Sequence, residues 1–240
     1  GTRLGLMSSH PSYHSIEGRD WVRLFATLDN GEGAAHRPSL TSWQGPAFDG
    51  YSDVARSSLA QSSFLLDVQK ELRPGAQIIE VAPEIENAPN SPFSKSDTVT
   101  WGQMALAQLH GADSLLLNLF TFGCRLSDEP WVGALLDEAR PGLDALARLF
   151  PPSMATSGVG VLWRPDAAQS ARTAQGQDML ELYVPLTPPA DLLQSMGIAV
   201  QARPGAVNCL WGQVAWSYPA EEVRAILSRN VWLDAEATAI

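Results

Sequence analysis

The segment I78-I79-E80-V81-A82-P83-E84-I85-E86 decides how this sequence is read, because an apolar strand in it runs directly into carboxylates. Side chains alternate between the two faces of a β-strand. One face therefore carries Ile79, Val81 and Ile85. The other carries Glu80, Ala82, Glu84 and Glu86. Burying an ionised carboxylate costs free energy unless the group is paired or has a functional role. The segment therefore predicts a functional carboxylate. The alternative is an acid that only caps the next helix or pairs with an arginine.

Predicted strands and helices alternate around this segment. Apolar runs predict strands at 4–9, 37–40, 78–85 and 114–120, and helical periodicity predicts helices at 17–28, 53–72, 100–111 and 131–150. Thr100 and Gln103 have the spacing of a capping box, and Pro141-Gly142 is expected to interrupt the last helix. Short strands separated by helices imply parallel pairing. The expected fold class is α/β, and residues 1–152 have the content of half a (β/α)8 barrel.

A second α/β unit is expected from residue 153 to residue 240, after the Pro151-Pro152-Ser153 boundary. Strands are predicted at 158–163, 198–202 and 207–210, and helices at 190–196 and 219–228, the latter with Pro at its start. Another helix start at 233–237 stands directly before the last residues. The sequence also begins without Met and almost directly in an apolar run, so we expect it to be part of a longer protein.

Composition narrows the possible partners and compartment. The net charge is −10, and Lys occurs only at Lys70 and Lys95, which argues against nucleic acid and anionic membranes as partners. The sequence contains no run of eighteen apolar residues, so it does not predict a membrane-spanning helix. Two cysteines make no disulfide framework, so we expect a reducing, cytoplasmic compartment. Four scattered histidines do not predict a structural zinc site.

Other candidate side chains lie in predicted loops. The loop at 8–19 carries His10, His14, Glu17 and Arg19, which suit hydroxyl recognition, although Glu17 and Arg19 could equally form a structural pair. Trp43 and Trp101 could stack on sugars or belong to the core. The absence of a G-x-S-x-G motif argues against a serine hydrolase. Cys209 lies in N-C-L-W-G-Q, without a glycine elbow, and is expected to be a buried thiol.

The sequence resembles a family of glycosidases. P83-E84-I85-E86-N87-A88-P89, F93-S94-K95-S96, G111-A112-D113 and the strand from Ser114 resemble the seventh and eighth strands of clan-A glycoside hydrolases, above all the family 42 β-galactosidases and the related families 164 and 165. E17-G18-R19 and R37-P38 fit the fifth and sixth strands. Residues 153–240 resemble the amidotransferase-like (flavodoxin-like) domain of these enzymes through L210-W-G-Q and V231-W-L-D-A-E-A.

The resemblance implies a segment of a retaining exo-β-glycosidase: the second half of a (β/α)8 TIM barrel, followed by a partial amidotransferase-like domain. It implies Glu84 as the nucleophile, with Glu80 as its rival. The implied substrate-binding residues are Glu86, Asn87, His10, His14, Glu17, Arg19, Arg37, Trp43, Lys95 and Asn118.

The same resemblance implies that the acid/base lies on the missing first half of the barrel. It also implies an oligosaccharide or glycoside substrate, no metal, no cofactor, and a homo-oligomer of the trimeric type. The alternative is a carbohydrate-binding or regulatory protein on a degenerate barrel. A working amidotransferase is a third and remote hypothesis.

Overall fold

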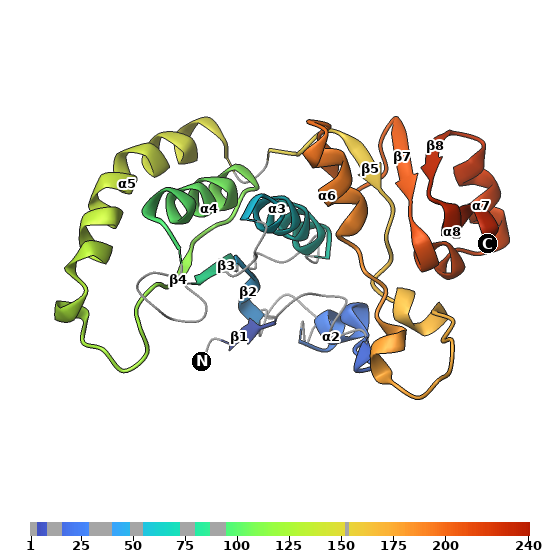
Figure 1. The fold of residues 1–240 in the computed structure, drawn as a ribbon, viewed down its shortest axis with the longest axis horizontal. Helices are drawn as coiled ribbons and strands as arrows, with labels where there is room; N and C mark the ends of the chain where they lie inside the picture. The colour runs from blue at the N-terminus through green and yellow to red at the C-terminus, as the bar shows by residue number, and fades with distance from the viewer. Residues whose placement is uncertain are drawn as a thin grey trace, which may run out of the picture.

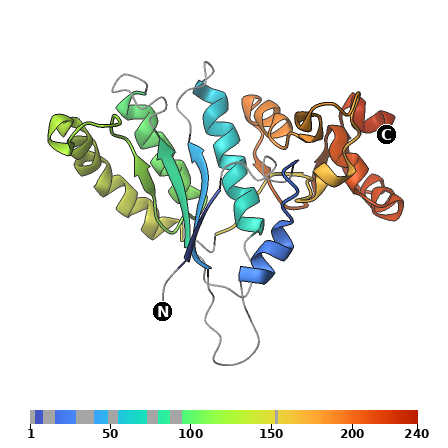
Figure 2. The ribbon, with the colours of Figure 1, turned by 90° about the horizontal axis from the view of Figure 1, so that it is seen from below.

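The computed structural model describes residues 4–8, 16–28, 40–48, 55–72, 80–86, 95–151 and 154–240, and the fold is α/β with two parallel sheets (Figure 1). The first sheet has the strand order β1-β2-β3-β4. These strands are β1 (Leu4–Met7), β2 (Leu40–Phe48), β3 (Glu80–Glu86) and β4 (Leu116–Asn118). All neighbours pair in parallel, as Figure 2 shows. The prediction of an α/β fold with parallel strands is confirmed.

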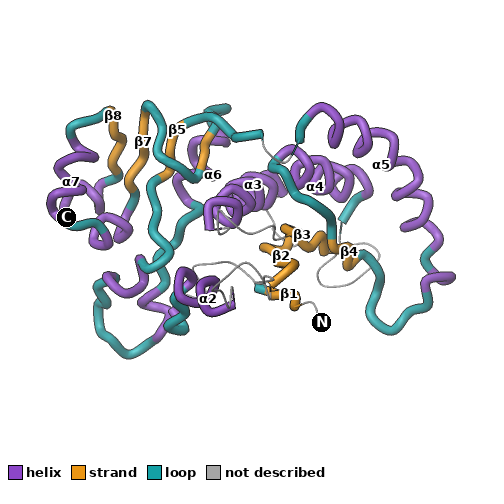
Figure 3. The backbone as a smooth tube through the Cα atoms, turned by 180° about the vertical axis from the view of Figure 1, so that it is seen from behind, coloured by secondary structure: helices purple, strands orange, loops and turns teal. Residues whose placement is uncertain are grey.

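A helix follows each strand of this sheet. These helices are α2 (Trp21–Leu28), α3 (Ala55–Leu72), α4 (Asp97–Leu109) and α5 (Pro130–Leu149). Figures 1 and 3 show α3, α4 and α5 on one side of the strands. Ile85 of β3 is fully buried there, in a core cluster with residues of the three helices such as Leu66, Met104 and Val132. This burial fixes which face of β3 is left for its carboxylates.

Two local predictions in this part were wrong. Helix α4 begins one turn earlier than the Thr100 capping box implies, because the Ser96 hydroxyl oxygen accepts the N–H of Val99 at 3.3 Å and caps the helix. Helix α5 runs unbroken through Pro141. Pro141 is on the exposed side of the helix, where the carbonyl that loses its intrahelical partner can face water.

The second sheet has the strand order β6-β5-β7-β8, again parallel. Its strands are β5 (Val159–Val161), β6 (Val200–Gln201), β7 (Val207–Leu210) and β8 (Asn230–Leu233). Its helices are α6 (Pro188–Ser195), α7 (Ala220–Leu227) and α8 (Ala235–Ala239). Strand β8 was not predicted as a strand. Asp234 caps α8, so the helix start predicted at 233–237 is confirmed.

Helix α3 joins the two halves of the molecule. Phe64 and Val68 belong to the core cluster of the second sheet, whereas Leu66 belongs to that of the first. Residues 62–69 of this helix are all buried, as expected for a helix covered on every side. Helix α6 lies against α3 in Figures 1 and 3. Within the described residues, no helix is both long enough and apolar enough to cross a bilayer.

Candidate functional site

The carboxylates of β3 occupy the face opposite its helices. Ile85 and Val81 are buried, and Ile85 packs against α4 and α5. Because side chains alternate along a strand, Glu80, Glu84 and Glu86 project from the other face. This sorting of the strand, predicted from the sequence, is confirmed for residues 80–86; Ile79 lies outside the described residues.

Glu80 stands at the amino-terminal end of β3, where it has a structural partner. The Ser114 hydroxyl donates to Oε1 of Glu80. Next to this contact, the Val81 N–H donates to Oδ2 of Asp113 at 2.9 Å, and the Asp113 N–H donates to the Val81 carbonyl at 3.0 Å. Since sites in parallel sheets lie at the carboxyl ends of the strands, this position argues against Glu80 as the nucleophile.

The carboxyl-terminal end of β3 brings together three residues that the sequence predicted to bind substrate. Glu86 is in register with Asn118 of β4, whose Nδ2 donates to Glu86 Oε1 at 3.3 Å. Lys95 Nζ donates to the backbone carbonyl of Glu86 at 2.8 Å and to Oε1 of the buried Gln103 at 2.6 Å. The ammonium group therefore ties the end of β3 to helix α4.

Glu84 lies two residues before Glu86 on the same face and is half-buried, in register with Leu116. Alternate residues of a strand are about 6.5–7 Å apart along the chain. Carboxylates accept hydrogen bonds from hydroxyl groups, and the Asn118 amide can both donate and accept. This end of the sheet can thus present one carboxylate for reaction and hold neighbouring hydroxyl groups through Glu86 and Asn118.

The segment before α2 contains the next two predicted residues. The Asp20 carboxylate accepts the N–H of Arg23 at 2.9 Å, so α2 begins at Trp21 and not at Glu17. The guanidinium of Arg19 lies 5.2 Å from the ring centre of the buried Trp21, a cation–π contact. Arg19 Nη1 is shielded from solvent and has no hydrogen-bond partner among the described atoms. Glu17 is exposed.

Several predicted site residues are not positioned by the structure. His10, His14, Arg37 and Asn87 lie outside the described residues, and so does the side chain of Trp43, whose backbone is part of β2. Trp101 is on α4, and its indole ring would be 3.6 Å from a Cβ placed on Gly142 of α5. Trp101 therefore lies against α5, with 41% of the residue exposed, and its role in sugar binding stays a prediction.

The loop after β4 holds a carboxylate that the sequence analysis missed. Glu129 is buried, and its two oxygens accept the Thr121 hydroxyl at 2.6 Å and the Thr121 N–H at 2.9 Å. These hydrogen bonds lower the pKa of Glu129. Burial, together with the nearby Glu129 carboxylate, raises the pKa of the Cys124 thiol, whose sulfur lies 3.5 Å from Glu129 Oε2. The Glu129 carboxylate therefore holds the loop that follows β4 through Thr121. In the sequence, only its position directly before Pro130 marks this residue.

Comparison with known proteins gives no relative for this chain. No protein-family model matches it, and neither the curated proteins nor the solved structures contain a significant match. Among the described residues, no group of three His, Cys, Asp or Glu side chains could hold a metal ion.

Proposed function

We propose that this chain is a segment of a retaining exo-β-glycosidase and carries its nucleophile, Glu84. The observation that supports this most is the acidic face of β3. Glu84 and Glu86 share that face toward the carboxyl end of the strand, beside Asn118, with the helices on the other side. Catalytic residues of parallel α/β barrels come from the carboxyl ends of their strands.

In the proposed reaction the Glu84 carboxylate attacks the anomeric carbon, and the bond to the leaving oxygen breaks. A carboxyl group outside β3 protonates that oxygen, then removes a proton from the water that hydrolyses the glycosyl ester. The family resemblance assigns this acid/base to the strands that precede those of this chain. Glu86 and Asn118 hold sugar hydroxyls, while Lys95 keeps the strand end in place through Glu86 and Gln103.

The proposal also assigns an architecture to each of the two sheets. Sequential parallel strands β1 to β4 suit the second half of a (β/α)8 barrel, and the order β6-β5-β7-β8 suits a flavodoxin-like, amidotransferase-like domain. Cys209 of that domain is fully buried, and burial raises its thiol pKa to about 12, which argues against nucleophilic catalysis by this thiol. The described cysteines are both free thiols, in keeping with a reducing, cytoplasmic compartment.

Turnover of aryl β-galactosides and β-mannosides by the complete gene product tests the proposal. Glu84→Gln removes the nucleophile with little change in shape and is expected to lower kcat by about 10⁴-fold or more. Glu138→Gln, the same change at an exposed position of α5, is the matched control and should leave kcat unchanged. If Glu80→Gln abolishes turnover while Glu84→Gln does not, the nucleophile has been assigned to the wrong residue.

A binding protein without hydrolysis is the second candidate. It is favoured by the fact that the described acids of this face all come from one strand, whereas hydrolysis needs two carboxyl groups on opposite sides of the glycosidic bond. Wild-type protein that binds galactose or mannose but turns over neither aryl glycoside would support this candidate over the enzyme.

A further inference from the structure

The junction between the two sheets contains two adjoining cavities that the candidate glycosidase site does not use. Their volumes are about 360 Å³ and 400 Å³, and both are lined by Ser63 of α3, Leu106 of α4 and Gln194 of α6. Ligand sites commonly lie between domains and have volumes of about 300–1,000 Å³. These cavities lie among the helices, on the side of the sheet that Ile85 faces, and the β3 carboxylates point away from it.

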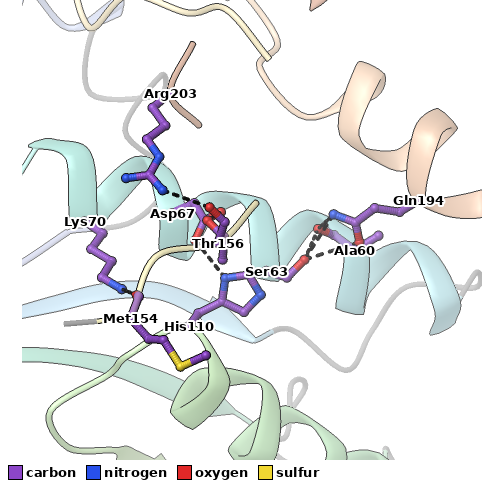
Figure 4. Close-up of polar contacts among 9 residues, drawn as sticks. All are labelled: Ala60, Ser63, Asp67, Lys70, His110, Met154, Thr156, Gln194 and Arg203. Carbon is purple, nitrogen blue, oxygen red and sulfur yellow. Dashed lines mark hydrogen bonds and ion pairs between the residues drawn. The ribbon is translucent and has the colours of Figure 1, made fainter. Parts of the chain in front are cut away.

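His110 is held in one orientation at the larger cavity. Its Nδ1 lies 2.8 Å from Oδ1 of Asp67, a carboxylate only 4% exposed, whose other oxygen accepts the Thr156 hydroxyl at 2.7 Å (Figure 4). A carboxylate beside Nδ1 accepts a hydrogen bond from that nitrogen, so the neutral imidazole carries its proton on Nδ1. The remaining nitrogen, Nε2, is then a hydrogen-bond acceptor on a side chain that lines the cavity.

The boundary between the two cavities is also built by hydrogen bonds. The Ser63 hydroxyl donates to the Ala60 carbonyl at 2.8 Å and lies 3.2 Å from Nε2 of Gln194 (Figure 4). Asp191, one turn before Gln194 on α6, lines the smaller cavity. Ser195 also lines the smaller cavity, and its hydroxyl donates a hydrogen bond to the Leu192 carbonyl at 2.7 Å. The described lining therefore offers acceptors at the Ser195 oxygen and His110 Nε2, together with donors at the Ser157 hydroxyl and the Gln194 amide.

The lining favours a neutral ligand that donates and accepts hydrogen bonds. No Lys or Arg is among the described residues that line either cavity, so these residues offer an anionic ligand no positively charged side chain of that kind. The same residues include no Trp, Tyr or Phe for a cation–π contact and only one acid, so they offer few favourable contacts to a cation. Leu59, Leu106, Ile198 and Val200 supply apolar walls. We propose that this junction cavity binds a small neutral polyhydroxylated molecule, with His110 Nε2 accepting from one of its hydroxyl groups.

The proposal does not rest on the glycosidase assignment. Titration with myo-inositol, a neutral polyol without an anomeric carbon, tests it in the complete gene product, with the ring nitrogens of His110 followed by NMR. We expect a saturable shift of the His110 Nε2 resonance, and none with inorganic phosphate or methylammonium. Binding should be unchanged in Glu84→Gln, so a failure of the glycosidase assignment would leave this result standing.

Two variants locate the binding. Ala199→Trp places a large ring on an exposed residue of the cavity wall and should abolish binding without disturbing the core. His110→Gln keeps a donor for Asp67 but moves the acceptor, and should weaken binding about tenfold, the effect expected from one hydrogen bond. Absence of any shift at His110, equal affinity in Ala199→Trp, or binding of phosphate in place of myo-inositol would overturn the proposal.

Discussion

His110 Nδ1 lies 2.8 Å from Asp67 Oδ1, and this contact joins helices α3 and α4 at the junction of the two sheets. The segment that leads into β5 is hydrogen-bonded to the same junction. Thr156 donates its hydroxyl to Asp67, its carbonyl accepts from Arg203 at 3.0 Å, and the Met154 carbonyl accepts from Lys70 at 2.8 Å. A small polar network thus connects both cores through one buried carboxylate.

Removal of that carboxylate should destabilise the protein. Asp67→Ala leaves the ring nitrogen of His110 and the Thr156 hydroxyl without their acceptor, which costs about 1–3 kcal/mol for a buried group. Urea unfolding measures the change. Asp144→Ala, an exposed aspartate of α5, is the matched control and should fall within about 0.5 kcal/mol of wild type. Equal stability of the two variants would mean that the network contributes nothing.

Two glycine substitutions should change stability in opposite directions. A Cβ on Gly160 of β5 would lie 2.6 Å from both the Arg203 carbonyl oxygen and Oδ1 of Asn208, so Gly160→Ala must displace backbone and is expected to cost more than about 1 kcal/mol. Gly133 lies in α5 with nothing within 4 Å of a Cβ, so Gly133→Ala should stabilise by up to about 1 kcal/mol. The melting temperature of Gly160→Ala tests the close packing around β5, and that of Gly133→Ala tests the helix propensity of α5.

Stability should fall in acid partly through Glu181. Its carboxylate accepts the backbone N–H groups of Gln175, Gly176 and Gln177 at 2.9, 3.1 and 3.3 Å, and these bonds lower its pKa from 4.5 to about 2. A carboxyl group with a lowered folded-state pKa stabilises the fold above its unfolded pKa. This contribution is therefore complete above about pH 4.5 and disappears as the pH falls toward 2.

The Glu181→Gln variant isolates that contribution. Its melting temperature should lie below that of wild type near neutral pH, and the two should converge as the pH falls toward 2. A difference between the two proteins that stays constant from neutral pH to pH 2 would show that the Glu181 carboxylate does not hold these backbone groups.

The two thiols should differ in reactivity. Cys209 is fully buried, and its pKa is raised to about 12, first by burial and then by Asp234. Cys124 is half-buried, with a smaller rise in pKa. Because the thiolate is the reactive form, a maleimide should label Cys124 slowly at mildly alkaline pH and Cys209 only after unfolding. Peptide mass spectrometry reads out both sites, and rapid labelling of native Cys209 would contradict its burial.

Local alternation predicted the orientation of β3 correctly because the rule depends only on neighbouring residues. The carboxylates of residues 80–86 and the buried side chain of Ile85 lie on opposite faces, as the pattern required. Strand β2 was predicted at 37–40, but it spans Leu40–Phe48 and contains Gly45 and Pro46, residues that normally break a strand. The pairing with β3 is irregular between Gly45 and Phe48, which accommodates them.

Contacts between segments that are distant in the chain could not be predicted from the sequence. Asp67 and His110 are 43 positions apart on different helices, and neither occurs in a recognisable motif. Glu86 and Asn118 were each predicted to bind substrate, but their contact depends on the register between β3 and β4, which only the folded chain determines.

Covalent trapping of the nucleophile tests the central proposal most directly. A 2-deoxy-2-fluoro-β-galactoside or β-mannoside with a good leaving group forms a long-lived glycosyl ester on the nucleophile of a retaining glycosidase, because the fluorine slows hydrolysis of the intermediate. Incubated with the complete gene product, it should add one sugar, and fragmentation of the labelled peptide should assign that sugar to Glu84. A label on Glu80, on Glu86 or outside β3, or no label on a protein that binds the sugar, would contradict the proposed mechanism.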